Sequence, residues 1–198
     1  MSFRAVLSCF VLVAICACAP ARNFDSAALS RQALVELSPQ SLRSNLALSQ
    51  SVKGELLGEG RSVRFELDIE NDRLVLVGLT HTGVPLFTVT QTGDNHVFTS
   101  TIPQNIAFAP EFLLADIKFV YWPIETLNLA IGALQSRVVE SSVNGHRHRA
   151  LKDEFGQTVV DVSYPKTGLA SGTLVVRHYD IPYILRIKTL PAQGGEAR

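Results

Sequence analysis

The residues best suited to chemistry in this chain are its five histidines and a few isolated acids and serines. His146 and His148 lie two positions apart, which puts both imidazoles on one face of a strand. Two imidazoles can begin a zinc site, but such a site needs three or four ligands, and no recognisable spacing supplies the rest. Arg147 and Arg149 would also repel a cation. The pattern favours a solvated basic hairpin, and a metal site is the alternative.

Catalytic motifs are missing from the sequence. Ser171 stands between Ala170 and Gly172 without a neighbouring base, and no G-x-S-x-G, phosphate-binding loop or dinucleotide fingerprint occurs. His81 and His178 fall on or beside expected strands and are interpreted as ordinary, partly buried histidines. We therefore predict that the protein is not an enzyme and has no cofactor.

Asp116 is the one acid within a strongly apolar stretch. A carboxyl group in such a place could have a raised pKa and act as an acid. Buried carboxylates are rare unless they are paired. We therefore expect Asp116 to bond a backbone group or to face water.

All three cysteines lie within the first eighteen residues, which leaves the rest of the chain without a thiol for a disulfide or a zinc-thiolate site. Arg4 precedes an apolar run over residues 5–17, which is short for a bilayer span. The run ends in Ile15-Cys16-Ala17-Cys18. We interpret residues 1–17 as a signal peptide.

This ending resembles the lipobox of bacterial lipoproteins, which implies that Cys18 is lipidated, with palmitate among its acyl chains, and anchors the chain to a membrane. Cys16 fits less well because the bulkier Ile15 would stand at the cleavage position. Ala19 follows where an aspartate would signal inner-membrane retention, so the resemblance implies the periplasmic face of the outer membrane. An ordinary secretory signal is the alternative.

Composition and charge limit the kinds of partner and fold that the chain is expected to have. The 198 residues carry no formal net charge, which does not favour a nucleic-acid partner. With 46% hydrophobic and 18% charged residues, the chain can build a core and is not expected to be disordered. We expect a lipidated tether at 18–28, one domain over 29–190 and a disordered tail at 191–198.

Alternation with a period of two predicts strands on both sides of a central helical stretch. The clearest runs through Val63, Phe65, Leu67 and Ile69, with charged residues between them. The expected strands cover 48–56, 63–70, 74–79, 86–90, 97–101, 137–143, 146–151, 157–164, 173–179 and 183–189. Asn144-Gly145 predicts a two-residue hairpin turn, with Glu140 opposite Arg149 and Val138 opposite Leu151.

The central stretch, Leu113–Gly132, contains the only tryptophan, followed at once by Pro123. It predicts two helices with a Trp-Pro corner, the first beginning at Pro110 and the second ending near Gly132 as its cap. The first is apolar on nearly all faces. A mainly β protein with a helical insert follows, in which a curved antiparallel sheet forms an unclosed half-barrel and the insert acts as a lid.

The chain resembles a family of bacterial lipoproteins encoded beside aryl-polyene biosynthesis genes. The similar stretches are Leu48–Val52, Leu74–Thr80 with Gly83 and Leu86-Phe87, Leu113–Asp116, Trp122-Pro123 and Val162–Tyr164. The order of elements also resembles the LolA/LolB lipoprotein carriers, a half-barrel with a helical lid over an apolar cavity. Fold alone does not fix function.

These resemblances imply an outer-membrane lipoprotein that binds an acyl or polyene chain, or the acyl groups of a lipoprotein, for transport or insertion. The expected lining is Phe112, Leu113, Leu114, Ile117, Phe119, Tyr121, Trp122, Leu127 and Ile131. A non-enzymatic scaffold for envelope assembly, with these residues filling a dry core, is the alternative.

Overall fold

The computed structural model describes residues 26–56, 59–100, 110–169, 172–181 and 183–191. Its helices are α1 (Ser26–Glu36), α2 (Pro110–Tyr121) and α3 (Ile124–Ile131), with short 3-10 turns η1 (Pro39–Leu42) and η2 (Gly132–Leu134). Its strands are β1 (Leu46–Leu56), β2 (Glu59–Glu70), β3 (Arg73–Leu79), β4 (Pro85–Thr92), β5 (Asn95–Ser100), β6 (Arg137–Val143), β7 (His146–Lys152), β8 (Thr158–Ser163), β9 (Thr173–His178) and β10 (Tyr183–Thr189). The predicted signal peptide, Cys18 and residues 192–198 lie outside the described residues.

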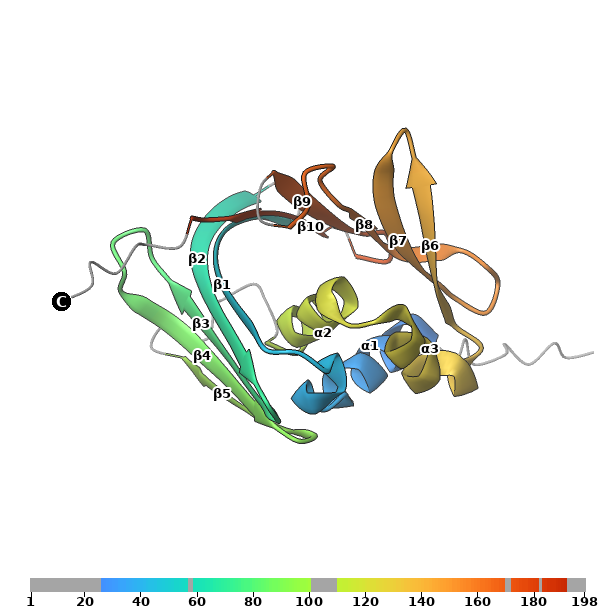
Figure 1. Cartoon of the computed structure of the whole chain (residues 1–198), viewed down its shortest axis with the longest axis horizontal. Coiled ribbons are helices and arrows are strands. Elements are labelled where there is room, and N and C mark those ends of the chain that lie inside the picture. The colour runs from blue at the N-terminus through green and yellow to red at the C-terminus, as the bar shows by residue number, and fades with distance from the viewer. Residues whose placement is uncertain (1–25, 57–58, 101–109, 170–171, 182, 192–198) are drawn as a thin grey trace, which may run out of the picture.

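The ten strands form one antiparallel sheet in the order β5-β4-β3-β2-β1-β10-β9-β8-β7-β6. The pairing of β1 with β10 joins the two meanders, while β5 and β6 lie at opposite ends of this order, so the described strands do not close into a barrel. Figure 1 shows the sheet bent around the three helices, which occupy its concave side. The predicted mainly β half-barrel with a helical insert is confirmed.

Alternation along β2 decides which face turns inward. Phe65, Leu67 and Ile69 are buried on the concave side, while the acidic residues between them point outward. On β3 the inner residues Leu74 and Leu76 are fully buried, but the outward Val75 and Val77 are only half-buried. The sequence of β3 is apolar on both faces, but only its inner face is fully buried.

The hairpin of β6 and β7 follows the predicted register. Glu140 pairs with Arg149 and Val138 pairs with Leu151. Asn144 and Gly145 have φ angles of 53° and 76°, the left-handed values that a two-residue hairpin turn requires. α3 ends at Ile131 with Gly132 as its cap residue, as predicted, but Gly132 is right-handed with a φ of −58°, and Gln135 after η2 takes the left-handed position.

Arg149 fixes the carboxyl end of α2 to the sheet. Its Nη1 donates to the carbonyl oxygens of Phe119 at 2.5 Å and Trp122 at 2.9 Å, and its Nη2 donates to Glu140 at 2.6 Å. The Tyr164 hydroxyl donates to the Val120 carbonyl at 2.8 Å. These bonds satisfy carbonyl groups that the end of a helix leaves without intrahelical partners.

Glu140 also binds Arg147, so an exposed and a buried arginine that share one carboxylate can be compared within one hairpin. The side chain of Arg149 is 2% exposed, whereas that of Arg147 is 49% exposed. Burial raises the pKa of Glu140, but hydrogen bonds from Arg147 and Arg149 outweigh it and hold the pKa below its usual value. Glu140 is therefore ionised at neutral pH and balances the buried guanidinium.

We predict that Arg149→Met destabilises the fold by about 3–5 kcal/mol, because buried carbonyls and the carboxylate lose their partner. Arg147→Met should cost less than about 1 kcal/mol, as for other exposed ion pairs. Urea unfolding of both variants measures the difference. Equal losses would show that the bonds to α2 contribute nothing beyond the ion pair with Glu140.

Candidate apolar ligand-binding face

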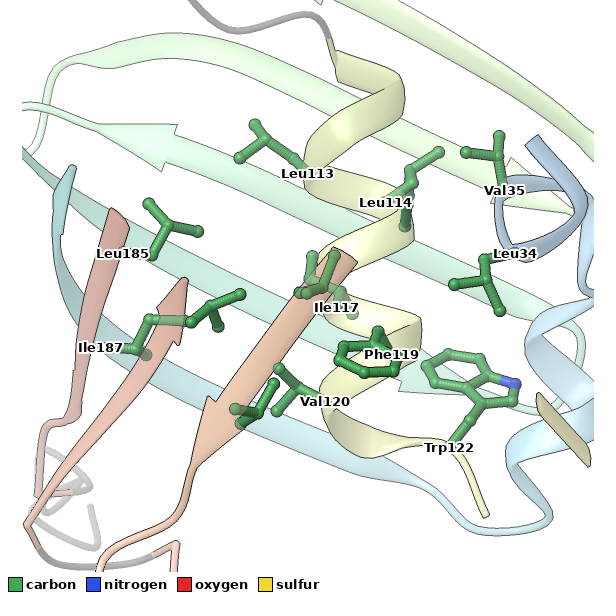
Figure 2. Packing of buried hydrophobic residues seen from close by; sticks show 14 of the residues in the cluster. Leu34, Val35, Leu113, Leu114, Ile117, Phe119, Val120, Trp122, Leu185 and Ile187 are labelled. Carbon is green, nitrogen blue, oxygen red and sulfur yellow. The ribbon is translucent and has the colours of Figure 1, made fainter. Parts of the chain in front are cut away.

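Eight of the nine predicted lining residues belong to or pack against one core cluster, and the ninth, Phe112, lies under the guanidinium of Arg31 at 5.3 Å. Phe112 and Tyr121 are half-buried, and the other seven are buried: Leu113, Leu114, Ile117, Phe119, Trp122, Leu127 and Ile131. Figure 2 shows Leu113, Leu114, Ile117 and Phe119 of α2 between Leu34 and Val35 of α1 and Leu185 and Ile187 of β10. Their side chains pack against other side chains of the protein, and a role as ligand lining remains a prediction.

The Trp122-Pro123 corner is held at two points. Trp122 is fully buried, and its indole Nε1 donates to the Ser41 hydroxyl at 2.7 Å. Its carbonyl oxygen accepts the bond from Arg149 described above. Bending at this corner would break both bonds, so the corner is a fixed point of the helical layer rather than a hinge.

An aromatic row that sequence reasoning missed crosses the concave face at β2, β4 and β5. Phe65 and Phe87 meet edge to face with ring centroids 5.8 Å apart, and Phe98 lies 5.9 Å from Phe87. Gly78 pairs with both Phe65 and Phe87. A Cβ atom at Gly78 would lie 2.2 Å from the Phe87 ring, so only glycine leaves room for the ring to cross β3.

The row runs from buried to exposed. Phe65 and Phe87 belong to the core, whereas Phe98 is 36% exposed at the edge strand. Phe98 pairs with the buried Val89, which places its ring on the concave face. The inward positions of the strands were a usable signal for Phe65, but the contact between rings from three strands depends on register and was not predictable from spacing.

Lys118 is fully buried and binds the end of α1. Its Nζ donates to the carbonyl oxygens of Val35 and Leu37, both at 2.6 Å, and the Gln91 amide nitrogen lies 3.1 Å from each. Burial lowers the pKa of Lys118 to about 7, although the negative charge of Glu36 opposes this. A neutral amine keeps two N–H groups, so it can still donate to both carbonyls.

The sequence suggested that Asp116 bonds a backbone group or faces water, but within the described ranges its carboxylate bonds only a side chain and is buried. Its Oδ1 lies 2.8 Å from Nε2 of His178, which is also buried rather than partly buried. His178 Nδ1 is 4.0 Å from Oδ1 of Asp180, which pairs with Arg31 of α1. This cluster ties α1 and α2 to the end of β9, a contact between positions 62 apart that no local pattern indicates.

Tyr183 lies against the same cluster, with its ring centroid 5.2 Å from that of His178. Burial, and then the negative charge of Asp116, raise the pKa of Tyr183 well above its usual value. It therefore stays a neutral phenol. A buried carboxylate, imidazole and phenol in this arrangement join elements of the fold.

The other histidines differ in environment. His146 Nδ1 lies 3.4 Å from the Tyr164 carbonyl, and His148 Nδ1 lies 3.2 Å from the Ser163 hydroxyl. His81 is exposed, contrary to the expectation of partial burial. Within the described ranges, no three His, Cys, Asp or Glu residues gather closely enough to hold a metal ion. Ser171 lies outside them.

The same ranges contain no helix with the length and apolar character needed to cross a bilayer. A family model described as "Protein of unknown function (DUF3261)" matches residues 47–191. No curated protein matches the chain.

Solved structures with a similar arrangement include a domain from Vibrio parahaemolyticus that is described as belonging to an outer membrane lipoprotein-sorting protein. It has 10% identity and a TM-score of 0.37, with 86% of this chain and 93% of that one covered. A LolA superfamily protein from Nitrosomonas europaea has 8% identity and a TM-score of 0.36, covering 83% and 91%. A DUF1329 family protein from Desulfovibrio piger has 9% identity and a TM-score of 0.33, covering 87% and 94%. Likeness at this level does not transfer a function.

The lowered pKa of Lys118 predicts a specific pH dependence of stability. In the unfolded chain a lysine titrates near 10.4, so between pH 7 and 9 the unfolded state holds a proton that the folded state releases. Stability should therefore rise with pH in this window, by about 2 kcal/mol relative to Lys118→Met.

Urea unfolding of the wild type and Lys118→Met at pH 7 and pH 9 measures this difference, and the exposed Lys188→Met serves as control. A stability gap between wild type and Lys118→Met that stays constant with pH would contradict the prediction.

Proposed function

The chain belongs to the DUF3261 family, and we propose that it is a non-enzymatic lipoprotein that binds an apolar chain on the concave side of its open sheet. The ligand is an acyl chain, a polyene chain or the acyl groups of another lipoprotein. Lipidated Cys18 anchors the protein at the periplasmic face of the outer membrane, where it takes part in transport or insertion of that ligand.

The observation that carries this proposal is the aromatic row. In a soluble domain with one covered sheet face, the apolar surface normally ends where the covering helices end. Here it continues from buried Phe65 and Phe87 to exposed Phe98 at the edge strand β5. An apolar chain on Phe98 would therefore reach the core along a continuous aromatic surface.

The anchors of α2 indicate where the helical layer would open. The bonds described above attach at residues 116–122, through Asp116, Lys118, the last carbonyls and Trp122. We therefore propose that the layer opens at the amino-terminal turn, around Phe112–Leu114. Beyond this turn the chain would contact the predicted lining residues in order along α2, and those on α3 last.

The driving force is removal of the ligand from water. Each buried methylene contributes about 0.8 kcal/mol, and the cost of association and of displacing Leu113 and Leu114 from their packing opposes it. Because these costs offset part of the gain, the ligand can be released when the helix turn packs back. Such reversibility suits transport better than storage.

The proposed location at the outer membrane and the proposed polyene ligand rest on the sequence resemblances to lipoproteins. The lipobox-like ending at Cys18 supports the anchor, and the resemblance to lipoproteins encoded beside aryl-polyene genes supports a polyene among the ligands. A rigid polyene has less conformational freedom to lose on binding than a saturated chain.

Burial of seven predicted lining residues favours a second candidate, a scaffold lipoprotein with a filled core. In that case the aromatic row would only stabilise the end of the sheet formed by β3, β4 and β5. A direct binding measurement separates the two candidates.

We predict that the mature chain bearing Cys18→Ala binds cis-parinaric acid, a fluorescent polyene fatty acid, and that Phe98→Glu weakens binding about tenfold or more. The control is Val97→Glu, the neighbour on the opposite face of β5, which is 65% exposed and should bind normally. Fluorescence titration gives both dissociation constants. Absence of binding by the unsubstituted chain, with no lipid found by mass spectrometry after purification, would favour the scaffold.

Anchoring has its own test. In cells supplied with radiolabelled palmitate, Cys18→Ser should abolish labelling of the protein, whereas Cys16→Ser should leave it, because Cys18 stands at the lipobox position. Labelling that depends on Cys16, or on neither cysteine, would refute the assignment.

A further inference from the structure

A depression of about 790 Å³ lies on the outer face of the sheet, opposite the helices. Its floor includes Val75 and Val77 of β3, and its apolar walls come from Leu169, Leu190 and Pro191. The strand register explains how these positions share a face. Val75 pairs with Asp68, and Val77 pairs with Glu66, so each outward valine has a carboxylate beside it on β2.

The valines are unusual for an outer face. A sheet with one face in water normally presents polar side chains there, as β2 does with Glu66, Asp68 and Glu70. β3 instead presents two half-buried valines to an open depression. The strand sequence is apolar on both faces, yet the helices cover only one of them.

The rim of the depression is negative. Glu66 binds Arg64 at 2.6 Å and the Ser49 hydroxyl at 3.0 Å, whereas exposed Asp68 has no ion-pair partner among the described residues. Asp68 also lines a second depression of about 280 Å³, with Glu70, Asp72 and Arg73. An apolar floor therefore continues into an acidic surface with a single cation.

We propose that this outer depression binds an apolar–basic segment of a partner protein, with apolar side chains on the valines and lysine or arginine side chains at Asp68. The apolar floor and the acidic rim are adjacent, so a partner that covers the valines must also contact the carboxylates. The inference does not depend on the proposed concave ligand site, since it concerns the opposite face of the sheet.

Charge separates this occupant from two others. An anionic membrane surface would be repelled by the carboxylates beside the valines. A second copy using the same face in a two-fold contact would bring like charges together. Both are outcomes of the test.

The probe is a fluorescein-labelled peptide of three Leu-Lys repeats, titrated by anisotropy onto the acylated mature protein in nanodiscs of zwitterionic lipid. We expect binding, with little binding of the Leu-Glu or Ser-Lys peptides. Val75→Lys, and separately Leu169→Glu in the β8–β9 loop, should weaken it about tenfold. Asp68→Asn should weaken it and reduce its salt dependence.

The matched controls are Val143→Lys and Asp94→Asn, which replace an exposed valine at the β6–β7 turn and an exposed aspartate at the β4–β5 turn. Both should bind the peptide normally. Val75→Lys should still bind cis-parinaric acid in the Cys18→Ala chain, which keeps this result separate from the concave site.

Equal binding of the Leu-Glu peptide, or binding unaffected by Val75→Lys and Leu169→Glu, would overturn the proposal. So would binding to phosphatidylglycerol vesicles that Val75→Lys abolishes, since the face would then contact a membrane. A dimer in sedimentation that Val75→Lys dissociates would instead assign the face to a second copy.

Discussion

The helical layer depends on hydrogen bonds from buried side chains to the backbone carbonyl groups at the ends of its helices. Helices on the concave side of a bent sheet end within the core, where water cannot reach the last carbonyls. Lys118 and Arg149 solve this problem for α1 and α2 in turn, each with a buried cationic group that donates to backbone oxygens. Without them the apolar faces of α1 and α2 could be buried only at the cost of unpaired polar groups.

The two solutions differ in charge. The buried Arg149 side chain forms an ion pair with Glu140, so α2 is coupled to the β6–β7 hairpin at the end of the sheet. Lys118 can lose its proton and still satisfy two carbonyls, so the contact between α1 and α2 needs no buried counter-ion. Together they make the carboxyl half of α2 rigid and leave its amino-terminal turn as the part whose movement would break the fewest of the described bonds.

Much of the fold could be predicted because it is local. Alternation defined the strands, Asn144-Gly145 set a register that placed Glu140 opposite Arg149, and Pro110 marked the start of α2. The site was less predictable. The Lys118 bonds and the Asp116–His178 pair join residues that are far apart in sequence, so their partners follow from the arrangement of helices on the sheet. Gly132 caps α3 as predicted, but the left-handed residue that often ends a helix comes only after the following 3-10 turn, at Gln135.

β3 carries apolar residues on both faces of the sheet, but the two faces have different surroundings in the fold. Leu74 and Leu76 meet the helical layer, while Val75 and Val77 lie in an open depression beside carboxylates. Bending of the sheet accounts for this difference, since a concave face can be filled by helices from the same chain and a convex face cannot be enclosed by a short connection. In the two proposals made above, an apolar ligand enters the concave side from the β5 edge, and a partner protein contacts the outer surface. A lipid carrier that must meet a partner would need both surfaces, and the open sheet keeps them apart.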